Sequence, residues 1–549
     1  MSAANLERKT AMNRLLPFAL GAATWALFGA AHAAVPGIGG TTFNLTAQDG
    51  YITQPDGQMV YSWGYGCAAQ APDGTPWSPT FQPAAITTGF CSTMQIPGPT
   101  LIVTEGQQVT VTLKNSLPSS AGGTSLLFPG FDVSATGGVP GVLTKEAAPG
   151  GTVTYSFTAT SPGTRAYYSG TQGDLQVEMG LFGAIVVLPS RTNPSYPTNC
   201  DAGLPATHPG NNAQAQAHWG EKDFRLANAA YDHPDACYDR EYLFQFSEMD
   251  PSIHKQAQAQ VAATAGCAAG TAGCSLKVPT EPYHPAYFMI NGRSMPDDMD
   301  PNYAPQYPHQ PYNGNPHMHP GELTLLRIVG QGRWQHPFHE HANHVRILAR
   351  DGNLILGKSA INFVTGPGTT SALALAGPLL FTTTTTPGQA MDGLFYYTAK
   401  GLNWDMYGHV SPQATLSCTP DANGYNTGNP TAINYFEWCQ DHNKPLEAKP
   451  FGSVGAGGPM TLPDANILVN GPWYGGSPYL GPEANTRAVG STPIPPFGTV
   501  ANSPTGEAGF AFMWHSHNER EITTNNIFPG GMLMMMLVDS REFVIDESM

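Results

Sequence analysis

The chain has 549 residues, of which 41% are hydrophobic and only 12% are charged, and it contains 62 glycines and 50 prolines. Its 24 Lys and Arg residues are outnumbered by 40 Asp and Glu residues, which gives a formal net charge of -16 at pH 7. Such an acidic surface argues against nucleic acid and against an anionic membrane as partners.

The first 33 residues have the pattern of an export signal. Basic residues up to Arg14 precede an apolar run over 15–30, and a small-residue cleavage site follows it. We expect cleavage near Ala33/Ala34 and a periplasmic or secreted protein. Removal of this segment takes away three positive charges and Glu7, so the net charge of -16 becomes -18. No later apolar run reaches the roughly 18 residues of a membrane span, so none is expected.

The chain has eight cysteines, which an exported protein can hold as disulfides. Eight cysteines allow many connectivities, so a pairing of neighbours along the chain is a guess. We predict that all eight are structural. The predicted couples are Cys67 with Cys91, Cys200 with Cys237, Cys267 with Cys274, and Cys418 with Cys439.

Short runs of β-branched and aromatic residues dominate the chain after the signal. Two examples are TLIVTEGQQVTVTLKNSLP at 100–118 and GTVTYSFTAT at 151–160. Gly, Pro, Asn and Asp bound these runs, as is typical of strands joined by turns. Long helical periodicity is hard to find. The chain is therefore predicted to be all-β, as a sandwich or a barrel.

Two His-X-His triplets are the strongest functional signal: His339 and His341 in HPFHEHANHV, and His515 and His517 in FMWHSHNERE. Side chains alternate faces along a strand, so both histidines of a triplet point the same way. Two such strands paired in one sheet would bring four imidazoles together. This predicts a metal site for copper, zinc, nickel or iron, and the intrinsic affinity order places copper first.

The stretch IPGPTLIVTEGQQVTVTLKNSLP at 96–118 resembles the opening strands of the first cupredoxin domain of multicopper oxidases such as laccases. The resemblance continues in the family's order through GTRAYYSG from Gly163, MGLFGAIVVLP from Met179, YFMINGRSMPDD from Tyr287 and HPGELTLLRIVG from His319. It implies two cupredoxin-like Greek-key β-barrel domains.

The resemblance also implies a division of the chain. The first domain would span 41–190, the linker 191–236, and the second domain, with the metal site, 237–549. A Pro- and Gly-rich interval at about 409–504 is predicted to be a disulfide-stapled insertion in the second domain. A rudimentary third domain is the alternative, because so long a loop without structure of its own is unusual.

The copper motifs match the family only in part. HPFHEH at 336–341 resembles the family motif H-P-x-H-x-H, which implies type 2 copper binding by His339 and type 3 copper binding by His341. His515 and His517 resemble the type 3 histidines of the H-C-H motif, but Ser516 stands between them. A serine hydroxyl cannot form the soft copper-thiolate bond of type 1 copper, so no blue copper centre is expected.

Other family positions have also changed. Ile522 and Ile527 stand where the family has the remaining type 1 histidine and the axial methionine. In the first domain, TSLLFPGF from Thr124 replaces the motif H-W-H-G, and Tyr167-Tyr168-Ser169-Gly170 replaces Y-H-S-H. Two of the four family histidine pairs are left, so a complete trinuclear cluster cannot be assembled.

Four more histidines are candidate metal ligands. His336 and His344 could add a second copper ion, but strand parity places them on the face opposite His339 and His341 unless the backbone bulges. Hydrogen bonding of His336 to Ser516 or to a backbone carbonyl is the alternative. His317 and His319 are either an auxiliary copper site or solvated loop residues.

Two carboxylates and a methionine run are weaker candidates. Glu340 and Glu519 could orient imidazoles or relay protons, or they could be solvated. The run MLMMML at 532–537 could supply soft thioether ligands, but we favour a buried last strand.

The leading prediction is an exported, multicopper-oxidase-like protein that binds one or two copper ions. It would act as an inner-sphere oxidoreductase on a small molecule or a metal ion, with dioxygen as a further partner, and phenol turnover should be weak. The alternatives are a non-catalytic copper carrier and a structural scaffold with a zinc site. The substrate and the oligomeric state stay open.

Overall fold

The computed structural model describes residues 35–201, 221–268, 270–357, 373–397, 419–438 without 423 and 433, 476–480, 485–486, 500–501, 508–539, 541 and 543–545. The predicted export signal and the couple of Cys418 and Cys439 lie outside these ranges. Among the described residues, no helix combines the length and the apolar character that a membrane crossing needs.

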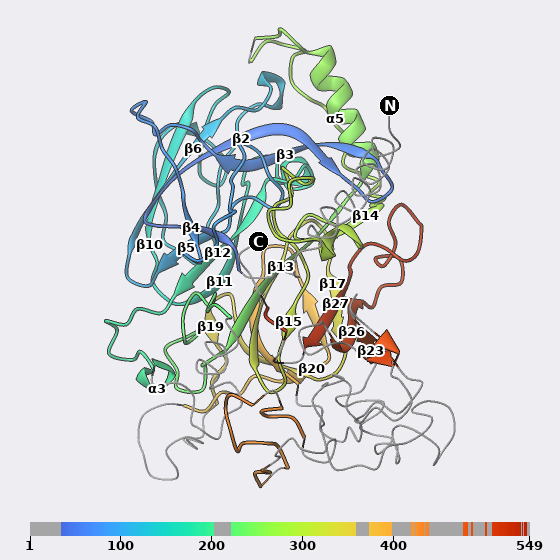
Figure 1. Ribbon diagram of the computed structural model, residues 1–549. Coiled ribbons are helices and arrows are strands. Elements are labelled where there is room, and N and C mark those ends of the chain that lie inside the picture. The colour runs from blue at the N-terminus through green and yellow to red at the C-terminus, as the bar shows by residue number, and fades with distance from the viewer. Residues whose placement is uncertain are drawn as a thin grey trace, which may run out of the picture.

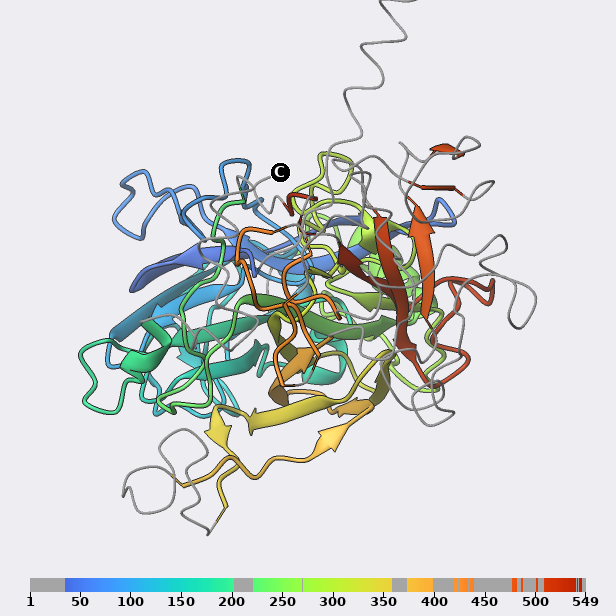
Figure 2. The ribbon, with the colours of Figure 1, turned by 60° about the horizontal axis from the view of Figure 1, so that its bottom comes forward.

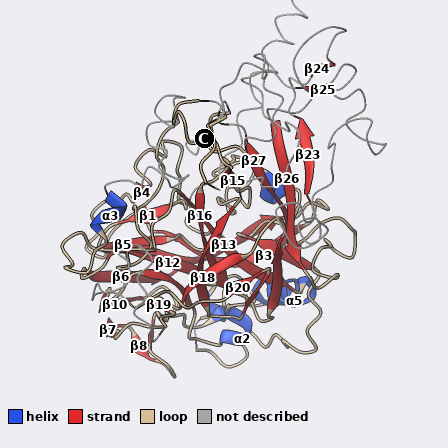
Figure 3. Cartoon of the chain, turned by 90° about the horizontal axis from the view of Figure 1, so that it is seen from below, coloured by secondary structure: helices blue, strands red, loops and turns tan. Residues whose placement is uncertain are grey.

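The described chain forms two β-rich halves, which Figures 1 and 2 show in blue to teal and in green to red. Strands dominate both halves, and the labelled helices lie at their margins (Figure 3). The prediction of an all-β chain is therefore confirmed.

The first half holds two five-stranded sheets, with strand orders β11-β12-β5-β1-β4 and β3-β2-β6-β10-β7. One apolar core joins them, with Leu101 and Ile185 from the first sheet and Val111 and Tyr155 from the second. Burial alternates along β10, as expected of a strand with one face on the core. The strands are β1 (Gly37–Gly39), β2 (Thr42–Thr53), β3 (Met59–Cys67), β4 (Thr80–Gln82), β5 (Leu101–Thr104), β6 (Gln108–Asn115), β7 (Ser134–Gly137), β8 (Val139–Pro140), β9 (Lys145–Glu146), β10 (Thr152–Thr158), β11 (Gly163–Tyr168) and β12 (Phe182–Leu188).

The second half holds a seven-stranded sheet, β14-β13-β16-β22-β18-β19 with β20 on β18, and a six-stranded sheet, β15-β27-β26-β17-β21 with β23 on β26. Phe246 and Ile328 of the first sheet share a core with Phe338 and Trp514 of the second. The strands are β13 (Arg240–Met249), β14 (Tyr287–Ile290), β15 (His317–Met318), β16 (Leu323–Gly330), β17 (His336–Glu340), β18 (Val345–Arg350), β19 (Asn353–Leu354), β20 (Leu379–Leu380), β21 (Thr382–Thr385), β22 (Ala390–Tyr396), β23 (Gly476–Leu480), β24 (Asn485–Thr486), β25 (Val500–Ala501), β26 (Ala508–Ser516) and β27 (Leu533–Asp539).

Helix α5 (Pro251–Ala263) packs across the two halves. It follows β13, yet its Ile253 and Ala257 belong to the core of the first half. The helix begins where the Asp250 carboxylate accepts a hydrogen bond of 2.8 Å from the Ser252 amide, with Pro251 in the first helical position. The other helices of the described residues are one turn each: α2 (Gly173–Gln176), α3 (Thr198–Asp201), and the 3-10 turns η1 (Ser119–Ala121) and η2 (Asp297–Met299).

Three of the four predicted cysteine couples form disulfides in the described chain, namely Cys67–Cys91, Cys200–Cys237 and Cys267–Cys274. The methionine run is the buried last strand, because Met532, Met534 and Met536 lie in the core of the second half. The expectation of a buried last strand is confirmed.

Most of the predicted insertion lies outside the described residues. Its described part includes β23, which pairs with the first half of β26 and so extends the sheet that carries His515 (Figure 3). Nearer the C-terminus, the Arg541 guanidinium donates a hydrogen bond of 2.8 Å to the Tyr435 carbonyl. The choice between an insertion and a third domain, and the division into 41–190, 191–236 and 237–549, stay predictions.

Candidate metal centre

The two His-X-His triplets lie on neighbouring antiparallel strands. In the register of β17 and β26, His339 is directly opposite His515, and Phe338 is opposite Ser516. The Trp514 indole donates a hydrogen bond of 3.0 Å to the His341 carbonyl, which ties the end of one triplet to the start of the other. The strand pairing expected from the sequence is therefore present.

The four imidazoles of these triplets, His339, His341, His515 and His517, contact one another. His339, His341 and His515 are between 6% and 9% exposed, whereas His517 faces solvent. The cluster therefore lies just beneath the surface. The ring centroids are separated by 4.5 Å for His339 and His517, 4.9 Å for His339 and His341, 5.0 Å for His341 and His515, 5.2 Å for His515 and His517, and 5.7 Å for His339 and His515.

The protonation of the cluster suits metal binding. Burial, together with the neighbouring His341, His517 and His515, lowers the pKa of His339 to about 4. Burial also lowers the pKa of His515. Both rings are therefore neutral at pH 7, and a neutral imidazole offers a nitrogen lone pair to a metal ion.

Hydrogen bonds orient two of these rings. His515 Nδ1 donates to the Ser516 carbonyl over 2.7 Å, which leaves its Nε2 as the ligand atom. His339 Nδ1 and the Thr382 hydroxyl share a hydrogen bond of 2.9 Å. Such outer contacts fix the ring orientation that a metal ion needs.

The nitrogen spacing of one pair of rings fits a shared ion. The Nε2 atoms of His341 and His515 are 3.1 Å apart. Two nitrogens that bind one ion at about 2.0–2.1 Å are separated by roughly 3.0–3.4 Å, so this pair could share an ion. As they stand, however, no three His, Cys, Asp or Glu side chains of the described chain are arranged to hold a metal ion. Metal binding by the four histidines therefore stays a prediction.

His336 lies outside the imidazole cluster, on the opposite face of β17. Its Nε2 donates to Glu248 over 2.9 Å and its Nδ1 donates to Glu521 over 3.0 Å. The Ser516 hydroxyl donates to the same Glu521 carboxylate over 2.5 Å. We name this set of four residues the acid-histidine network. It lies where the resemblance would place type 1 copper.

The acid-histidine network reverses the usual effect of burial on a histidine. Burial by itself lowers the pKa of His336, but the hydrogen bonds to Glu248 and Glu521 outweigh it and raise the pKa to about 9. His336 is therefore an imidazolium at pH 7. We expected His336 to bond Ser516 or a backbone carbonyl, whereas Glu521 bridges His336 and Ser516 instead. Sequence reasoning missed Glu248 and Glu521, which are 88 and 185 residues from His336.

His344 follows a turn after β17, so strand parity does not carry through to it. Its ring stacks on Phe381 with centroids 3.7 Å apart, and the same Phe381 ring lies 6.3 Å from His339. Burial lowers the pKa of His344. His344 is therefore close to the imidazole cluster, because Phe381 lies next to both His344 and His339.

His317 and His319 are buried, so the expectation of solvated loop residues is wrong. They are 0% and 2% exposed. His317 Nδ1 bonds the Asp539 carboxylate over 2.5 Å, and His319 Nε2 bonds Glu221 over 3.1 Å. An auxiliary copper site at these residues stays a prediction.

Glu340 and Glu519 have opposite surroundings. Glu340 is fully buried, burial raises its pKa well above the usual range, and its carboxyl accepts a hydrogen bond of 2.5 Å from the Thr383 hydroxyl. Because it alternates with His339 and His341, it points to the core and not to their imidazoles. Glu519 is exposed. The solvated interpretation therefore fails for Glu340.

Comparison with known proteins supports the resemblance. A family model described as multicopper oxidase matches residues 80–192. The chain is 40% identical to Laccase-3 of Botryotinia fuckeliana over 94 residues, which are 17% of this chain and 20% of that protein. It is 34% identical to Oxidoreductase tpcJ of Aspergillus fumigatus over 105 residues, 18% of this chain and 17% of that protein. The matches thus span about a fifth of these relatives or less.

Two solved structures are similar over most of the chain. The multicopper oxidase mgLAC has a TM-score of 0.41 and 13% identity, over 90% of this chain and 86% of that chain. The blue copper oxidase from Nitrosomonas europaea has a TM-score of 0.41 and 14% identity, over 90% and 85% of the two chains.

Proposed function

Because the chain belongs to the multicopper oxidase family, we propose that it is a copper oxidoreductase whose copper ligands are His339, His341, His515 and His517. The observation that carries this proposal is the contact of four imidazoles, three of them largely buried, at two paired strands, with ring centroids 4.5 to 5.7 Å apart. The donor set has no thiolate and no carboxylate, which suits copper better than a hard cation. One or two ions would be bound.

Bound copper would supply a one-electron couple and an open coordination position for a substrate. The chain supplies the rest. Neutral His339 and His515 present lone pairs, and the Ser516 carbonyl and the Thr382 hydroxyl hold those rings in orientation. His517 faces solvent, so a small molecule, a metal ion or dioxygen reaches this edge of the cluster without crossing the protein.

The acid-histidine network supports inner-sphere rather than laccase-like chemistry. A type 1 copper site needs a thiolate and neutral imidazoles. Ser516 offers only a hydroxyl, which it donates to Glu521, and both nitrogens of His336 are donated to carboxylates. The usual relay of electrons from an outer-sphere substrate is therefore missing, and oxidation of phenols should be weak. Export to the periplasm or medium, from the N-terminal signal, is part of the proposal.

The test is metal analysis and paramagnetic resonance on the full chain, exported by its own signal. We expect one or two copper ions per chain, a type 2 signal and no intense blue absorption. The double variant H515A/H517A should lose the copper, whereas His309→Gln, at a half-buried histidine bonded to the Tyr51 carbonyl, should keep it.

Other outcomes reassign the protein. Copper that binds in the wild type but never supports oxygen consumption would indicate a copper carrier. Zinc that is lost in H515A/H517A together with thermal stability would indicate a structural scaffold. Copper retained in H515A/H517A would overturn the assignment of the ligands.

A further inference from the structure

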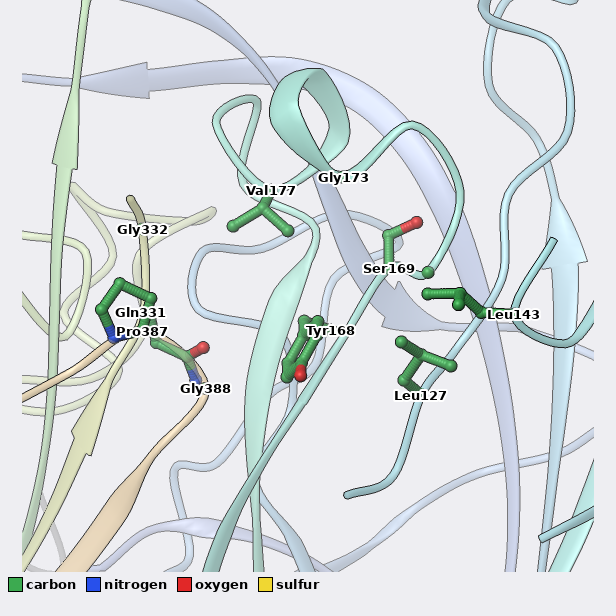
Figure 4. Close-up of a pocket in the computed structure, with 11 residues that line it drawn as sticks. Leu127, Leu143, Tyr168, Ser169, Gly173, Val177, Gln331, Gly332, Pro387 and Gly388 are labelled. Atoms are coloured by element: carbon green, nitrogen blue, oxygen red, sulfur yellow. The ribbon is translucent and has the colours of Figure 1, made fainter. Parts of the chain in front are cut away.

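A cavity of about 300 Å³ lies between the two halves, away from the histidine cluster. Figure 4 shows Leu127 and Leu143 on one side of it, Pro387 and Gly388 on the other, and the Tyr168 ring between them. None of the residues that line it is one of the four clustered histidines. A volume of this size is at the lower end of pockets that hold small molecules.

The cavity is built from the two segments that replace the family's first-domain histidine pairs. Leu127 belongs to TSLLFPGF, and Tyr168, Ser169 and Gly170 belong to the segment in the place of Y-H-S-H. An isolated bridge joins Leu127 to Tyr168, with amide-to-carbonyl hydrogen bonds of 2.8 and 3.3 Å. Both segments are therefore held side by side although neither carries a histidine.

The replacement residues disfavour metal binding at this place. A Cβ atom added to Gly170 would lie 2.8 Å from Leu127 Cγ, so the leucine fills the space next to the backbone at that position. The walls have become aliphatic and aromatic, with Leu127, Val177 and Pro387 around the Tyr168 ring. Such walls favour a flat apolar molecule over an ion.

Among the side chains that line the cavity in the described chain, one hydrogen-bond donor is left for a ligand. The Ser169 hydroxyl donates to Gln176, and the Gln331 amide nitrogen donates to the Gly183 carbonyl and to Gln245. No hydrogen bond of the Tyr168 hydroxyl is found within the described chain. Burial, and then the negative charge of Asp351, raise the pKa of Tyr168, so the phenol keeps its proton. The same negative charge disfavours an anionic ligand.

We propose that this cavity binds a small neutral aromatic molecule that carries one hydrogen-bond acceptor, with the acceptor on the Tyr168 hydroxyl and the ring between Leu127 and Pro387. The site is separate from the proposed copper ligands, so it stands or falls independently of copper binding. An aryl ketone has the required shape and acceptor.

Calorimetry with 4-bromoacetophenone on the full chain tests the proposal, with 1-bromo-4-ethylbenzene as the probe that lacks the acceptor. We expect saturable binding of the ketone. Tyr168→Phe should weaken ketone binding about three- to tenfold, which is the range of one net hydrogen bond, and should leave the ethyl probe unchanged. The anomalous signal of the bromine in a crystal should place the ketone beside Tyr168.

A matched pair of substitutions controls for added bulk. Val177→Phe adds a ring to a half-buried wall of the cavity, whereas Val142→Phe adds it to a side chain that is 93% exposed. Gly173→Leu is a second filling variant, since an added Cβ there meets no heavy atom within 4 Å and the fold should persist. Val177→Phe and Gly173→Leu should each bind the ketone at least tenfold more weakly than the wild type. Val142→Phe should bind it with wild-type affinity.

Three results would overturn the proposal. The first is no saturable ketone binding by the wild type. The second is wild-type affinity in both Val177→Phe and Gly173→Leu. The third is a bromine site elsewhere in the molecule.

Discussion

The two faces of β17 carry histidines with opposite properties. His336 points into the core between Glu248 and Glu521, and its pKa is raised to about 9. Three residues further on, His339 points to the other face among three imidazoles, and its pKa is lowered to about 4. Both side chains are largely buried, so burial alone does not decide the charge. The neighbouring groups do, because carboxylates stabilise an imidazolium and other imidazoles do not.

Strand β26, which pairs with β17, shows the same difference between its two faces. On β26, Ser516 joins the acid-histidine network, whereas His515 and His517 face the other imidazoles. One face of this strand pair therefore carries the hydrogen-bonded ionic groups around His336, and the other carries the clustered imidazoles, of which His339 and His515 are neutral. We infer that the first face stabilises the fold and the second binds copper. Four experiments test this contrast.

The largest effect is expected from Glu248→Ala. Glu248 accepts hydrogen bonds from His336, from the Tyr283 hydroxyl, and from the Arg333 and Trp334 amides. Removing it leaves a buried imidazolium with one partner fewer and two amides without an acceptor. A buried pair broken on one side costs about 3–5 kcal/mol in the free energy of unfolding. Chemical denaturation measures the loss.

The control for Glu248→Ala is Glu281→Ala. Glu281 pairs with Arg333 over 2.7 Å, but its side chain is 71% exposed, so its loss should change stability by no more than about 1 kcal/mol. Equal losses in the two variants would show that the acid-histidine network does not stabilise the fold.

The second-largest effect is expected in how the free energy of unfolding depends on pH, because His336 titrates. A histidine whose pKa is raised on folding contributes stability that is fully present below its unfolded value of about 6.5. That contribution is lost as the pH rises through the folded value of about 9. The full contribution is on the order of 3 kcal/mol. His336→Gln should therefore differ most from the wild type at pH 6 and least near pH 10. A difference that does not vary with pH would contradict a charged His336.

On the other face, Thr382→Val tests the orientation of His339. The Thr382 hydroxyl bonds His339 Nδ1 over 2.9 Å, and loss of such an outer contact typically weakens metal binding about 10–100-fold. Competition with a copper chelator measures the affinity. Thr384→Val, at an exposed position of the same strand, should leave it unchanged. If both variants bind copper like the wild type, His339 is not held by Thr382 for metal binding.

The sequence predicted the face with the histidine triplets because alternation along a strand is a local rule. The two triplets were sufficient to pair β17 with β26 and to gather His339, His341, His515 and His517. The buried strand β27 and three disulfides were predicted for similar reasons, from a short apolar run and from cysteines that neighbour one another in the chain.

The ionic face was not predictable in this way. Glu248 comes from β13 and Glu521 from the loop after β26, so their contact with His336 depends on how distant segments pack. The same holds for His317 and His319, which lie in a Pro- and Asn-rich stretch that resembles a solvated loop. Their partners Asp539 and Glu221 are 222 and 98 residues away. No spacing rule connects such residues.

The smallest effect is expected where the family resemblance would suggest the largest. Ser516→Cys restores the cysteine between His515 and His517, yet we expect no intense blue absorption from the copper-loaded variant. A type 1 site also needs a neutral imidazole, whereas both nitrogens of His336 are donated to carboxylates at pH 7. The position of the axial methionine, Ile527, is 65% exposed, and Ile522 offers no ligand.

Absorption spectroscopy of Ser516→Cys and of the triple variant S516C/E521Q/I522H separates the two causes. The triple variant frees His336 from one carboxylate and supplies a second imidazole, so any blue absorption should appear there first. Blue absorption in Ser516→Cys alone would mean that the acid-histidine network opens readily. In that case the missing thiolate, and not the charge on His336, is what excludes type 1 copper from this face.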